Sequence, residues 1–201
     1  MARETGIFRL EISLACGDIQ IYGSPLYFER TVTNAMNSAP KAGPGQPQAS
    51  YIRKATAADA SRIAEIYVFN NRLVYFPILG DALFSFRQLQ VRSYIQTVEQ
   101  RLADTYVYDD GILKGFIVIT GKEIKKLHVD HFFQGQGIGG CLLRFAVQGC
   151  CAEHVWVFEK NENALAFYKK NGFTQTSEKN DLLCTDGHKE TLVKMALPPK
   201  A

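Results

Sequence analysis

The chain of 201 residues has no long apolar run. No stretch approaches the roughly 20 apolar residues that a membrane helix needs. The N-terminus is mildly apolar, but Arg9, Glu11 and Asp18 interrupt it, and no targeting segment is convincing. We therefore expect a cytoplasmic protein with no membrane partner.

The chain also lacks a large net charge of either sign. Lys and Arg number 23 against 20 Asp and Glu, which gives a formal net charge of +3. The basic residues do not cluster as they do on surfaces that bind nucleic acids. This balance argues against a nucleic-acid partner.

Cysteines at metal-ligand spacing are also lacking. The five cysteines are Cys16, Cys141, Cys150, Cys151 and Cys184, and no pair has the spacing of a metal site. We therefore expect no metal. Three of them fall in or near an apolar helical stretch, where they are interpreted most simply as buried, reduced thiols. A catalytic thiol is the alternative.

The remaining composition is that of a globular protein. Hydrophobic residues make up 46% and charged residues 21% of the chain, which is ordinary for a soluble domain with a core. Residues 37–50 read NSAPKAGPGQPQAS and are interpreted as a linker rich in Pro and Gly. We expect residues 1–36 to be an extension of unknown role, residues 51–201 to be the functional domain, and residues 1–49 to be dispensable for its folding.

From residue 51 the pattern of apolar residues predicts alternating strands and helices. Thr56 and Asp59 form a capping-box pair before a helix whose inner face carries Ile63, Ile66, Tyr67 and Asn70. The other predicted helices are residues 84–102, 139–149 and 162–170, and the predicted strands are residues 51–54, 105–108, 112–120, 123–129, 155–158, 173–177 and 191–197. Antiparallel strands followed by a strand–helix–strand unit predict an α+β domain with a mixed sheet.

A glycine-rich loop is the central motif. Leu127-His128-Val129 ends a predicted strand, and Gln134-Gly135-Gln136-Gly137-Ile138-Gly139-Gly140 opens the helix that follows. The first turn of a helix has unpaired N–H groups and a dipole that favours negative charge. Glycines let the backbone approach a phosphate closely. The motif is therefore typical of an anion site.

Three interpretations of this glycine-rich loop are open besides the one given by the family resemblance below. A nucleoside triphosphate loop would need a Lys-Ser/Thr pair, which is missing. A dinucleotide fingerprint fits Gly135 to Gly140, and Glu159 lies near the expected acidic position, but residues 130–134 separate the strand from the glycines. The third is a strand–glycine–helix packing unit with no ligand.

Two motifs in order resemble the GNAT acetyltransferase family over about residues 51–197. Gln134 to Gly139 fits the family's Arg/Gln-x-x-Gly-x-Gly/Ala loop after a strand that ends in Leu-x-Val. The second motif is Val155-Trp156-Val157, then Asn161 to Ala164, then Phe167-Tyr168 and Gly172-Phe173. The resemblance implies the GNAT fold, with a mostly antiparallel sheet whose two central strands splay apart.

The resemblance also implies acetyl-CoA as the co-substrate. In the family, pantetheine lies in the gap between the splayed strands and the glycine loop binds the pyrophosphate. The implied binding residues are Leu127, His128, Val129, Gln134, Gly135, Gln136, Gly137, Ile138, Gly139, Gly140, Asn161, Ala164 and Phe167. Asn161 is alternatively only a helix N-cap. Side chains of a strand alternate between its two faces, so regular alternation would put Ile124 on one face and Leu127 and Val129 on the other. A β-bulge between them is predicted, because one extra residue would account for this change of face.

Two residues are candidates for catalysis. The resemblance places Tyr168 near the CoA sulfur as a proton donor, and a core aromatic residue is the alternative. Glu123 lies six residues before Val129, the offset of a catalytic glutamate in some family members, and a solvated surface charge is its alternative. We expect the His128 ring to point to the opposite face from Leu127 and Val129, so that its backbone, not its imidazole, serves the site.

Residues 67–86 carry six aromatic side chains, with Pro77 and Gly80 breaking the helix. In the family this region covers the acceptor, so these rings either line an acceptor pocket or pack on the sheet. The resemblance implies an enzyme that transfers an acetyl group to an amine of a small molecule or a protein, and it leaves a homodimer open. A CoA-binding module that has lost catalysis is the alternative.

Overall fold

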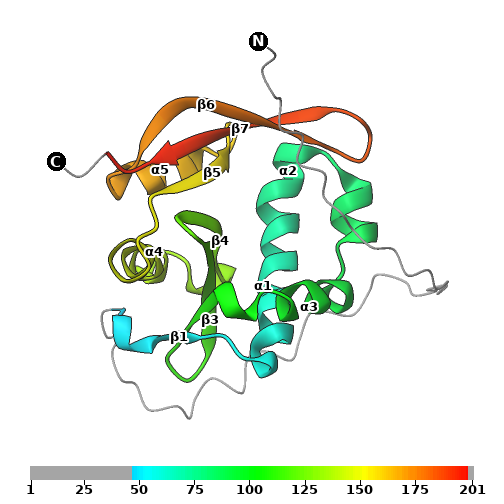
Figure 1. Cartoon of the computed structure of the whole chain (residues 1–201). Helices are drawn as coiled ribbons and strands as arrows, with labels where there is room; N and C mark the ends of the chain where they lie inside the picture. Colours follow the sequence, from blue (N-terminus) through cyan, green and yellow to red (C-terminus); the bar gives the residue numbers. More distant parts are fainter. Residues whose placement is uncertain (1–46, 199–201) are drawn as a thin grey trace. The chain divides into compact units, whose positions relative to one another are not determined.

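The computed structural model describes residues 47–198 (Figure 1). The proposed extension, the linker up to residue 46 and Cys16 lie outside the described residues. The described part forms a seven-stranded sheet in the order β1-β2-β3-β4-β5-β7-β6. Its strands are β1 (Ile52–Lys54), β2 (Thr105–Asp109), β3 (Leu113–Thr120), β4 (Glu123–Val129), β5 (His154–Phe158), β6 (Thr174–Leu183) and β7 (Lys189–Ala196).

Every neighbouring pair of strands is antiparallel except β4 and β5, which are parallel. The helices are α1 (Ala60–Asn70), α2 (Phe76–Leu79), α3 (Val91–Glu99), α4 (Ile138–Gly149) and α5 (Glu162–Lys170). The α+β fold with a mostly antiparallel sheet is therefore confirmed. Within the described part of the chain, each of these helices is too short or too polar to cross a membrane.

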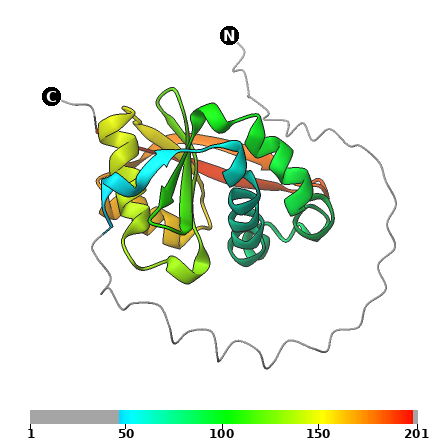
Figure 2. The same cartoon turned by 90° about the horizontal axis from the view of Figure 1, so that it is seen from below.

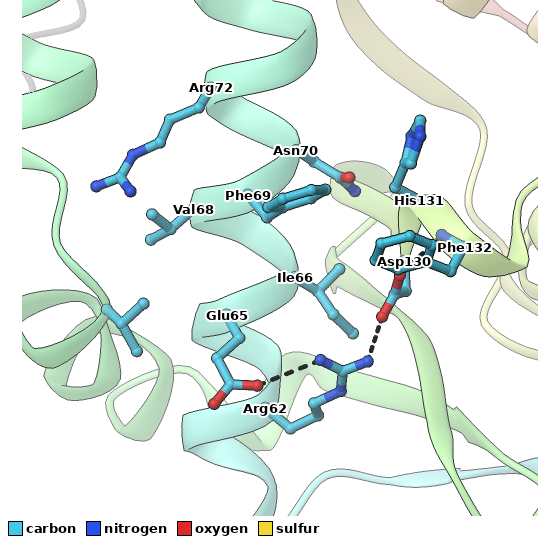
Figure 3. Close-up of a pocket in the computed structure, with 11 residues that line it drawn as sticks. Arg62, Glu65, Ile66, Val68, Phe69, Asn70, Arg72, Asp130, His131 and Phe132 are labelled. Carbon is cyan, nitrogen blue, oxygen red and sulfur yellow. Dashed lines mark hydrogen bonds and ion pairs between the residues drawn. The ribbon is translucent and has the colours of Figure 1, made fainter. Parts of the chain in front are cut away.

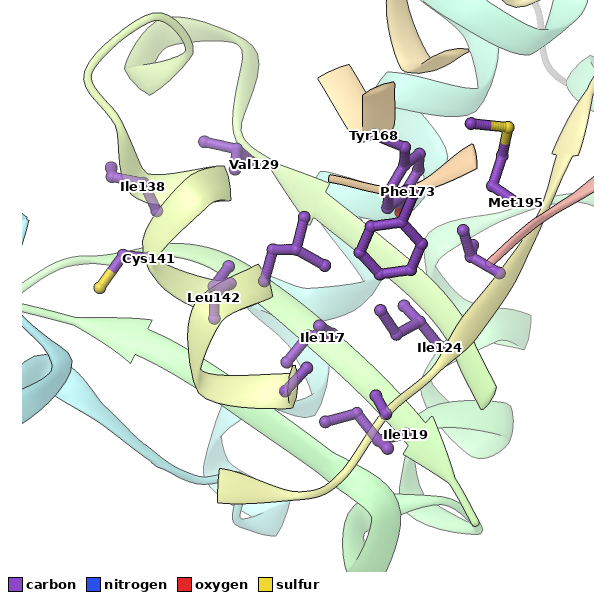
Figure 4. Packing of buried hydrophobic residues seen from close by; sticks show 14 of the residues in the cluster. Ile117, Ile119, Ile124, Val129, Ile138, Cys141, Leu142, Tyr168, Phe173 and Met195 are labelled. Atoms are coloured by element: carbon purple, nitrogen blue, oxygen red, sulfur yellow. The ribbon is translucent and has the colours of Figure 1, made fainter. Parts of the chain in front are cut away.

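The helices cover the two faces of the sheet separately (Figure 2). One buried cluster joins α1 and α3 to β2 and β3, with Ile63, Val107 and Phe116 among its members. The other joins α4 and α5 to the central strands, with Ile117, Leu142 and Tyr168 among its members (Figure 4). The strands that lie between the two clusters therefore have apolar residues on both faces.

The capping box before α1 is confirmed. The Asp59 carboxylate accepts hydrogen bonds from the Thr56 N–H at 2.8 Å and from the Thr56 hydroxyl at 2.9 Å. The inner face of α1 is also as expected, because Ile63, Ile66, Tyr67 and Asn70 are all buried.

The helix predicted over residues 84–102 is wrong in extent. A π-helical segment, Leu83–Gln88, comes first, and α3 begins only at Val91. Leu89 and Gln90 between them have extended backbone, with ψ of 96° and 148°. The Arg72 guanidinium donates to the Ser85 and Leu89 carbonyls at 3.1 and 3.3 Å. In a continuous helix these carbonyls would accept hydrogen bonds from the following turn. The interruption leaves them free to accept from Arg72 instead.

The strand predicted over residues 173–177 is longer than expected. Strand β6 runs to Leu183 because it forms a hairpin with β7, with Leu183 opposite Lys189. It lies at the edge of the sheet and is mostly exposed. An exposed strand has no alternating apolar signal to reveal it in the sequence.

The predicted β-bulge in β4 is confirmed. Val118 of β3 pairs with Lys126, but the next residue, Ile119, pairs with Ile124, so Lys125 has no partner on β3. The extra residue moves Ile124, Leu127 and Val129 to the same face, where all three contact the cluster of α4 and α5. The His128 ring points to the other face, as expected.

The His128 ring lies among aromatic side chains. It stacks on Phe116 at 5.3 Å between ring centroids and meets Tyr67 edge-on at 5.1 Å. Burial, with a smaller effect from the charge of Lys126, lowers the pKa of His128 to about 3. The imidazole is therefore neutral at physiological pH, with a proton on only one of its two nitrogens.

This burial predicts a pH-dependent stability. An unfolded chain protonates His128 near its ordinary pKa of about 6.5, whereas the folded chain does so only near 3. The contribution of neutral His128 to the free energy of unfolding is therefore fully present above pH 6.5 and is lost as the pH falls. At pH 5 this loss is about 2 kcal/mol. Urea denaturation of wild type and of His128→Phe between pH 7.5 and 4.5 should show a smaller pH slope in the variant. The exposed His131, replaced by Phe, is the control and should keep the wild-type slope; an equal slope in all three proteins would contradict the assignment.

Candidate functional site

Strands β4 and β5 separate after two residue pairs. Glu123 pairs with His154 and Ile124 with Val155, and no pairing follows although both strands continue. The splay implied by the family resemblance is therefore present. It leaves a gap along the second half of β4.

The backbone of β4 directs polar groups into this gap. The Asp130 N–H donates to the Lys114 carbonyl at 2.8 Å, which makes Gly115 and Val129 a non-hydrogen-bonded pair. Peptide groups of an antiparallel strand alternate in direction, so those of Leu127 and Val129 turn away from β3. They face the side where β5 has moved away. Two of the three residues implied to bind pantetheine thus present backbone groups that no strand uses.

The Val129 carbonyl is already bound. The Asn70 side chain donates to it from α1 at 2.9 Å, and the Gln134 side chain donates to it at 3.1 Å. Sequence reasoning placed Asn70 on the inner face of α1 but gave it no part in the site. A buried amide on an otherwise apolar helix face was the signal that could have found it.

The glycine loop has the backbone that its sequence requires. Gly135 and Gly137 have φ of 77° and 83°, a region that residues with a Cβ adopt at a cost. Gly137 is the N-cap of α4 and offers no side chain to cap it, so the first N–H groups of the helix remain available. Gln134 to Gly137 are exposed, whereas Ile138 is buried in the core.

Gly139 lies where three elements meet. A Cβ at this position would lie 3.5 Å from the Phe167 ring of α5 and 3.6 Å from the Val129 side chain. Gly140, one residue further, is half-buried near Arg144. The structure therefore brings the end of β4, the start of α4 and the middle of α5 together, as the two sequence motifs implied.

Asn161 is the N-cap of α5. Its side chain accepts a hydrogen bond from the Ala164 N–H at 3.1 Å, and the residue is buried. The N-cap interpretation is confirmed, and a role in binding a ligand stays a prediction.

Tyr168 is a core residue whose hydroxyl bonds no other residue of the described part of the chain. Its ring contacts Phe167 and Phe173, with centroids at 5.1 and 5.5 Å (Figure 4). Within residues 47–198 no hydrogen bond involves its hydroxyl, and burial raises its pKa above the ordinary value. The core interpretation thus holds, and the phenol keeps its proton at neutral pH.

Glu123 lies at the other end of β4. It is in the paired part of the two strands, and Lys125 Nζ lies 2.5 Å from its carboxylate, with His154 Nε2 at 3.9 Å. Six residues of extended strand span on the order of 20 Å. The structure therefore does not bring Glu123 to Val129, and a proton moving between them would travel through water.

Tyr75 closes the gap on the face of α1. Its ring meets His128 of β4 at 5.9 Å and Phe158 of β5 at 5.6 Å between centroids, both edge-on. Among the rings of residues 67–86 it is the one that contacts both splayed strands. In the sequence, nothing distinguishes Tyr75 from the other aromatic residues of this region.

A separate cavity of about 280 Å³ lies between α1 and the connection that follows β4 (Figure 3). Phe69 and Phe132 stack at its mouth with centroids 6.2 Å apart. Arg62 crosses it to bind Asp130 and pairs with Glu65 at 3.2 Å. The sequence did not predict this cavity.

The thiols of the described part lie apart from the gap. Burial raises the pKa of Cys141, and burial together with nearby carboxylates raises the pKa of Cys184 to about 11. Neither is an activated nucleophile at neutral pH. Within residues 47–198 no three His, Cys, Asp or Glu side chains converge as a metal site would require.

We predict that Gly137→Leu abolishes binding of the acetyl-CoA that the resemblance implies, because its side chain would occupy the mouth of the anion site. Gly121→Leu is the matched control, since Gly121 also has a positive φ, of 58°, but lies in the β3–β4 turn. Each variant should lose about 1–2 kcal/mol of stability for the left-handed residue, and Gly137→Leu should lose more, because its Cβ would lie 3.2 Å from the Pro47 ring whereas that of Gly121→Leu would meet no neighbour. Calorimetry should detect binding only to the control; wild-type affinity in a folded Gly137 variant would contradict the anion site.

Comparison with known sequences agrees with these features. The family model described as an acetyltransferase (GNAT) domain matches residues 101–175. The peptidyl-lysine N-acetyltransferase YjaB of Salmonella typhimurium is 40% identical over 70 residues, which are 34% of this chain and 48% of that protein. Its Escherichia coli counterpart is 37% identical over the same shares. The matched region spans about half the length of these curated relatives.

Comparison with solved structures covers more of the chain. The apo form of YjaB from Escherichia coli superposes with a TM-score of 0.57 at 22% identity, over 74% of this chain and 97% of that one. YncA from Salmonella typhimurium, a putative acetyltransferase solved with acetyl-CoA, gives a TM-score of 0.52 at 20% identity over 75% and 95%. These likenesses establish the fold. The family model and the curated relatives add that a segment within this fold, residues 101–175, is similar to GNAT acetyltransferases.

Proposed function

We propose that this protein transfers the acetyl group of acetyl-CoA directly to a primary amine, with both substrates bound at once. The observation that carries the proposal is the separation of β4 from β5 beside the glycine loop. An extended thioester substrate with a pyrophosphate at its far end fits such a site. Its amide-rich arm would pair with the Leu127 and Val129 backbone, and its phosphates would bind the N–H groups of the loop and of α4.

Tyr168 is the proposed acid. Transfer to an amine leaves a thiolate that must take up a proton. The phenol of Tyr168 is buried and protonated, and it has no hydrogen-bond partner within the described residues. It can therefore donate to the departing sulfur without first breaking a bond to the protein.

The acceptor is proposed to be an amine of a protein or a small molecule. The relatives in Salmonella and Escherichia coli are named as peptidyl-lysine N-acetyltransferases. A lysine side chain is therefore the first acceptor to test. We also propose that residues 51–201 carry this activity and that residues 1–49 are dispensable for it.

A CoA-binding module without catalysis is the second candidate. It is favoured by the position of Glu123, which is ion-paired with Lys125 and does not lie in the open part of the gap. The two functions differ in one measurement. Labelled acetyl-CoA incubated with lysine peptides and small primary amines gives a labelled product only if the chain is an enzyme.

Calorimetry with acetyl-CoA and with NADH tests the ligand class. We expect acetyl-CoA to bind and NADH to bind much more weakly, because the spacer between Val129 and Gly135 departs from the dinucleotide fingerprint. NADH binding as tight as that of acetyl-CoA would overturn the proposal. Binding of acetyl-CoA without any acetylated product would favour the silent module.

We predict that Tyr168→Phe lowers turnover by about a hundredfold or more and leaves acetyl-CoA binding nearly unchanged. The ring still packs on Phe167 and Phe173, whereas the proton donor is lost, and general acid catalysis is worth about 10² to 10⁴. Steady-state rates at saturating substrates and calorimetry measure the two quantities. Wild-type turnover in the variant would leave Tyr168 as a core residue only.

We predict that Glu123→Gln loses turnover near pH 7 and regains part of it at high pH. A lysine-like amine, with a pKa of about 10.4, is mostly charged at neutral pH and must lose a proton before it attacks. If Glu123 accepts that proton through water, free amine at high pH replaces its function. Rates between pH 6.5 and 10 measure this effect. Identical profiles for variant and wild type would make Glu123 a structural partner of Lys125.

A further inference from the structure

Tyr75 occupies its position because α1 does not continue as an α-helix. Residues Asn71–Tyr75 form a π-helical turn, in which the Phe76 N–H bonds the Asn71 carbonyl five residues earlier. In an α-helix, position 75 would lie about 140° around the axis from Asn70. Val74, the position that an α-helix would turn inward, is instead 37% exposed. The wider turn therefore places Tyr75 on the inner face, and such turns recur at functional sites.

The surroundings of Tyr75 are aromatic and uncharged. Its ring lies against the neutral imidazole of His128 and the ring of Phe158, each on a different splayed strand. Burial, with smaller effects from Tyr67 and Tyr168, raises the pKa of the Tyr75 hydroxyl. Within residues 47–198 that hydroxyl has no hydrogen-bond partner. The oxygen of this neutral phenol is thus able to accept a hydrogen bond from the N–H group of a bound amine.

Tyr75 and Tyr168 approach the gap from opposite faces of the sheet. Tyr168 belongs to the cluster of α4 and α5, whereas Tyr75 contacts His128 on the face of α1 and α3. If Tyr168 serves the departing sulfur, the acceptor must come from the other face. Tyr75 is the side chain that contacts both strands there.

We propose that Tyr75 binds the acceptor, its hydroxyl accepting a hydrogen bond from the amine nitrogen and its ring restricting entry to unbranched primary alkylamines. This inference rests on the proposed acetyl transfer and specifies the acceptor side of the same site. The Tyr75 ring contacts a residue of each strand, His128 of β4 and Phe158 of β5. We therefore expect an alkyl chain to pass along the face of the ring, and a branch on the carbon that bears the nitrogen to meet one of these two side chains.

The role is tested with two conjugates that need no turnover. CoA is joined through an S-CH₂-CO bridge to n-butylamine in one and to sec-butylamine in the other, and each is compared with free CoA by calorimetry. Wild type should bind the linear conjugate at least tenfold more tightly than the branched one. Tyr75→Phe should lose roughly fivefold to tenfold in affinity for the linear conjugate, the worth of one hydrogen bond, and keep its affinity for CoA within about twofold.

Two further variants sharpen the result. Tyr75→Ala should bind both conjugates about equally, because the restricting ring is gone. Tyr94→Phe is the matched control, since Tyr94 is buried on the same face but stacks on Tyr67, at 4.1 Å, away from β5. It should behave as wild type, and thermal unfolding should confirm that all variants are folded.

The outcomes separate this inference from the proposed function. If wild type binds CoA but does not distinguish the conjugates, or if Tyr75→Phe binds the linear one as wild type does, the role of Tyr75 is overturned while the CoA site stands. If wild type binds neither CoA nor the conjugates, the proposed function itself fails, and the inference fails with it.

Discussion

The separation of β4 from β5 is the constraint on which the rest of the structure depends. Two residue pairs hold the parallel strands together, and beyond them the β4 peptide groups of Leu127 and Val129 have no strand to bond. Unpaired backbone groups inside a domain are costly unless another partner satisfies them. Asn70 and Gln134 satisfy one carbonyl, and the proposed thioester substrate would satisfy others. In the proposed function, the substrate supplies the missing strand contacts and so offsets the cost of the interrupted sheet.

The bulge at Lys125 assigns a different task to each face of β4. It places Ile124, Leu127 and Val129 together against α4 and α5, where the glycine loop and Tyr168 lie. It leaves His128 on the other face with Tyr67 and Tyr75. Burial keeps the His128 ring neutral on that second face, and the Lys126 ammonium lies over the Tyr67 ring at 4.3 Å. One extra residue in the strand thus separates the apolar face that packs on α4 and α5 from the face that carries His128 and its aromatic neighbours.

The sequence predicted most of this fold because its elements have strong local signals. The capping pair of Thr56 and Asp59 and the glycine loop each require particular residues, and both lie where expected. The interrupted helix near Leu89 and the long edge strand β6 were missed. The first depends on a tertiary contact from Arg72, and the second on pairing with β7 rather than on burial. Tyr75 and Asn70 could not be assigned from the sequence because their roles depend on which strands they reach.

The π-helical turn at Asn71–Tyr75 amounts to a surplus of one residue in a helix. Removing a single codon there would restore ordinary helical winding and rotate every later side chain of that segment by about 100°. The glycine loop, α4 and α5 come from residues far along the chain and would keep their own geometry. A lineage could therefore exchange one acceptor for another through an insertion or deletion on one side of the sheet, while the machinery for the acyl donor is inherited intact.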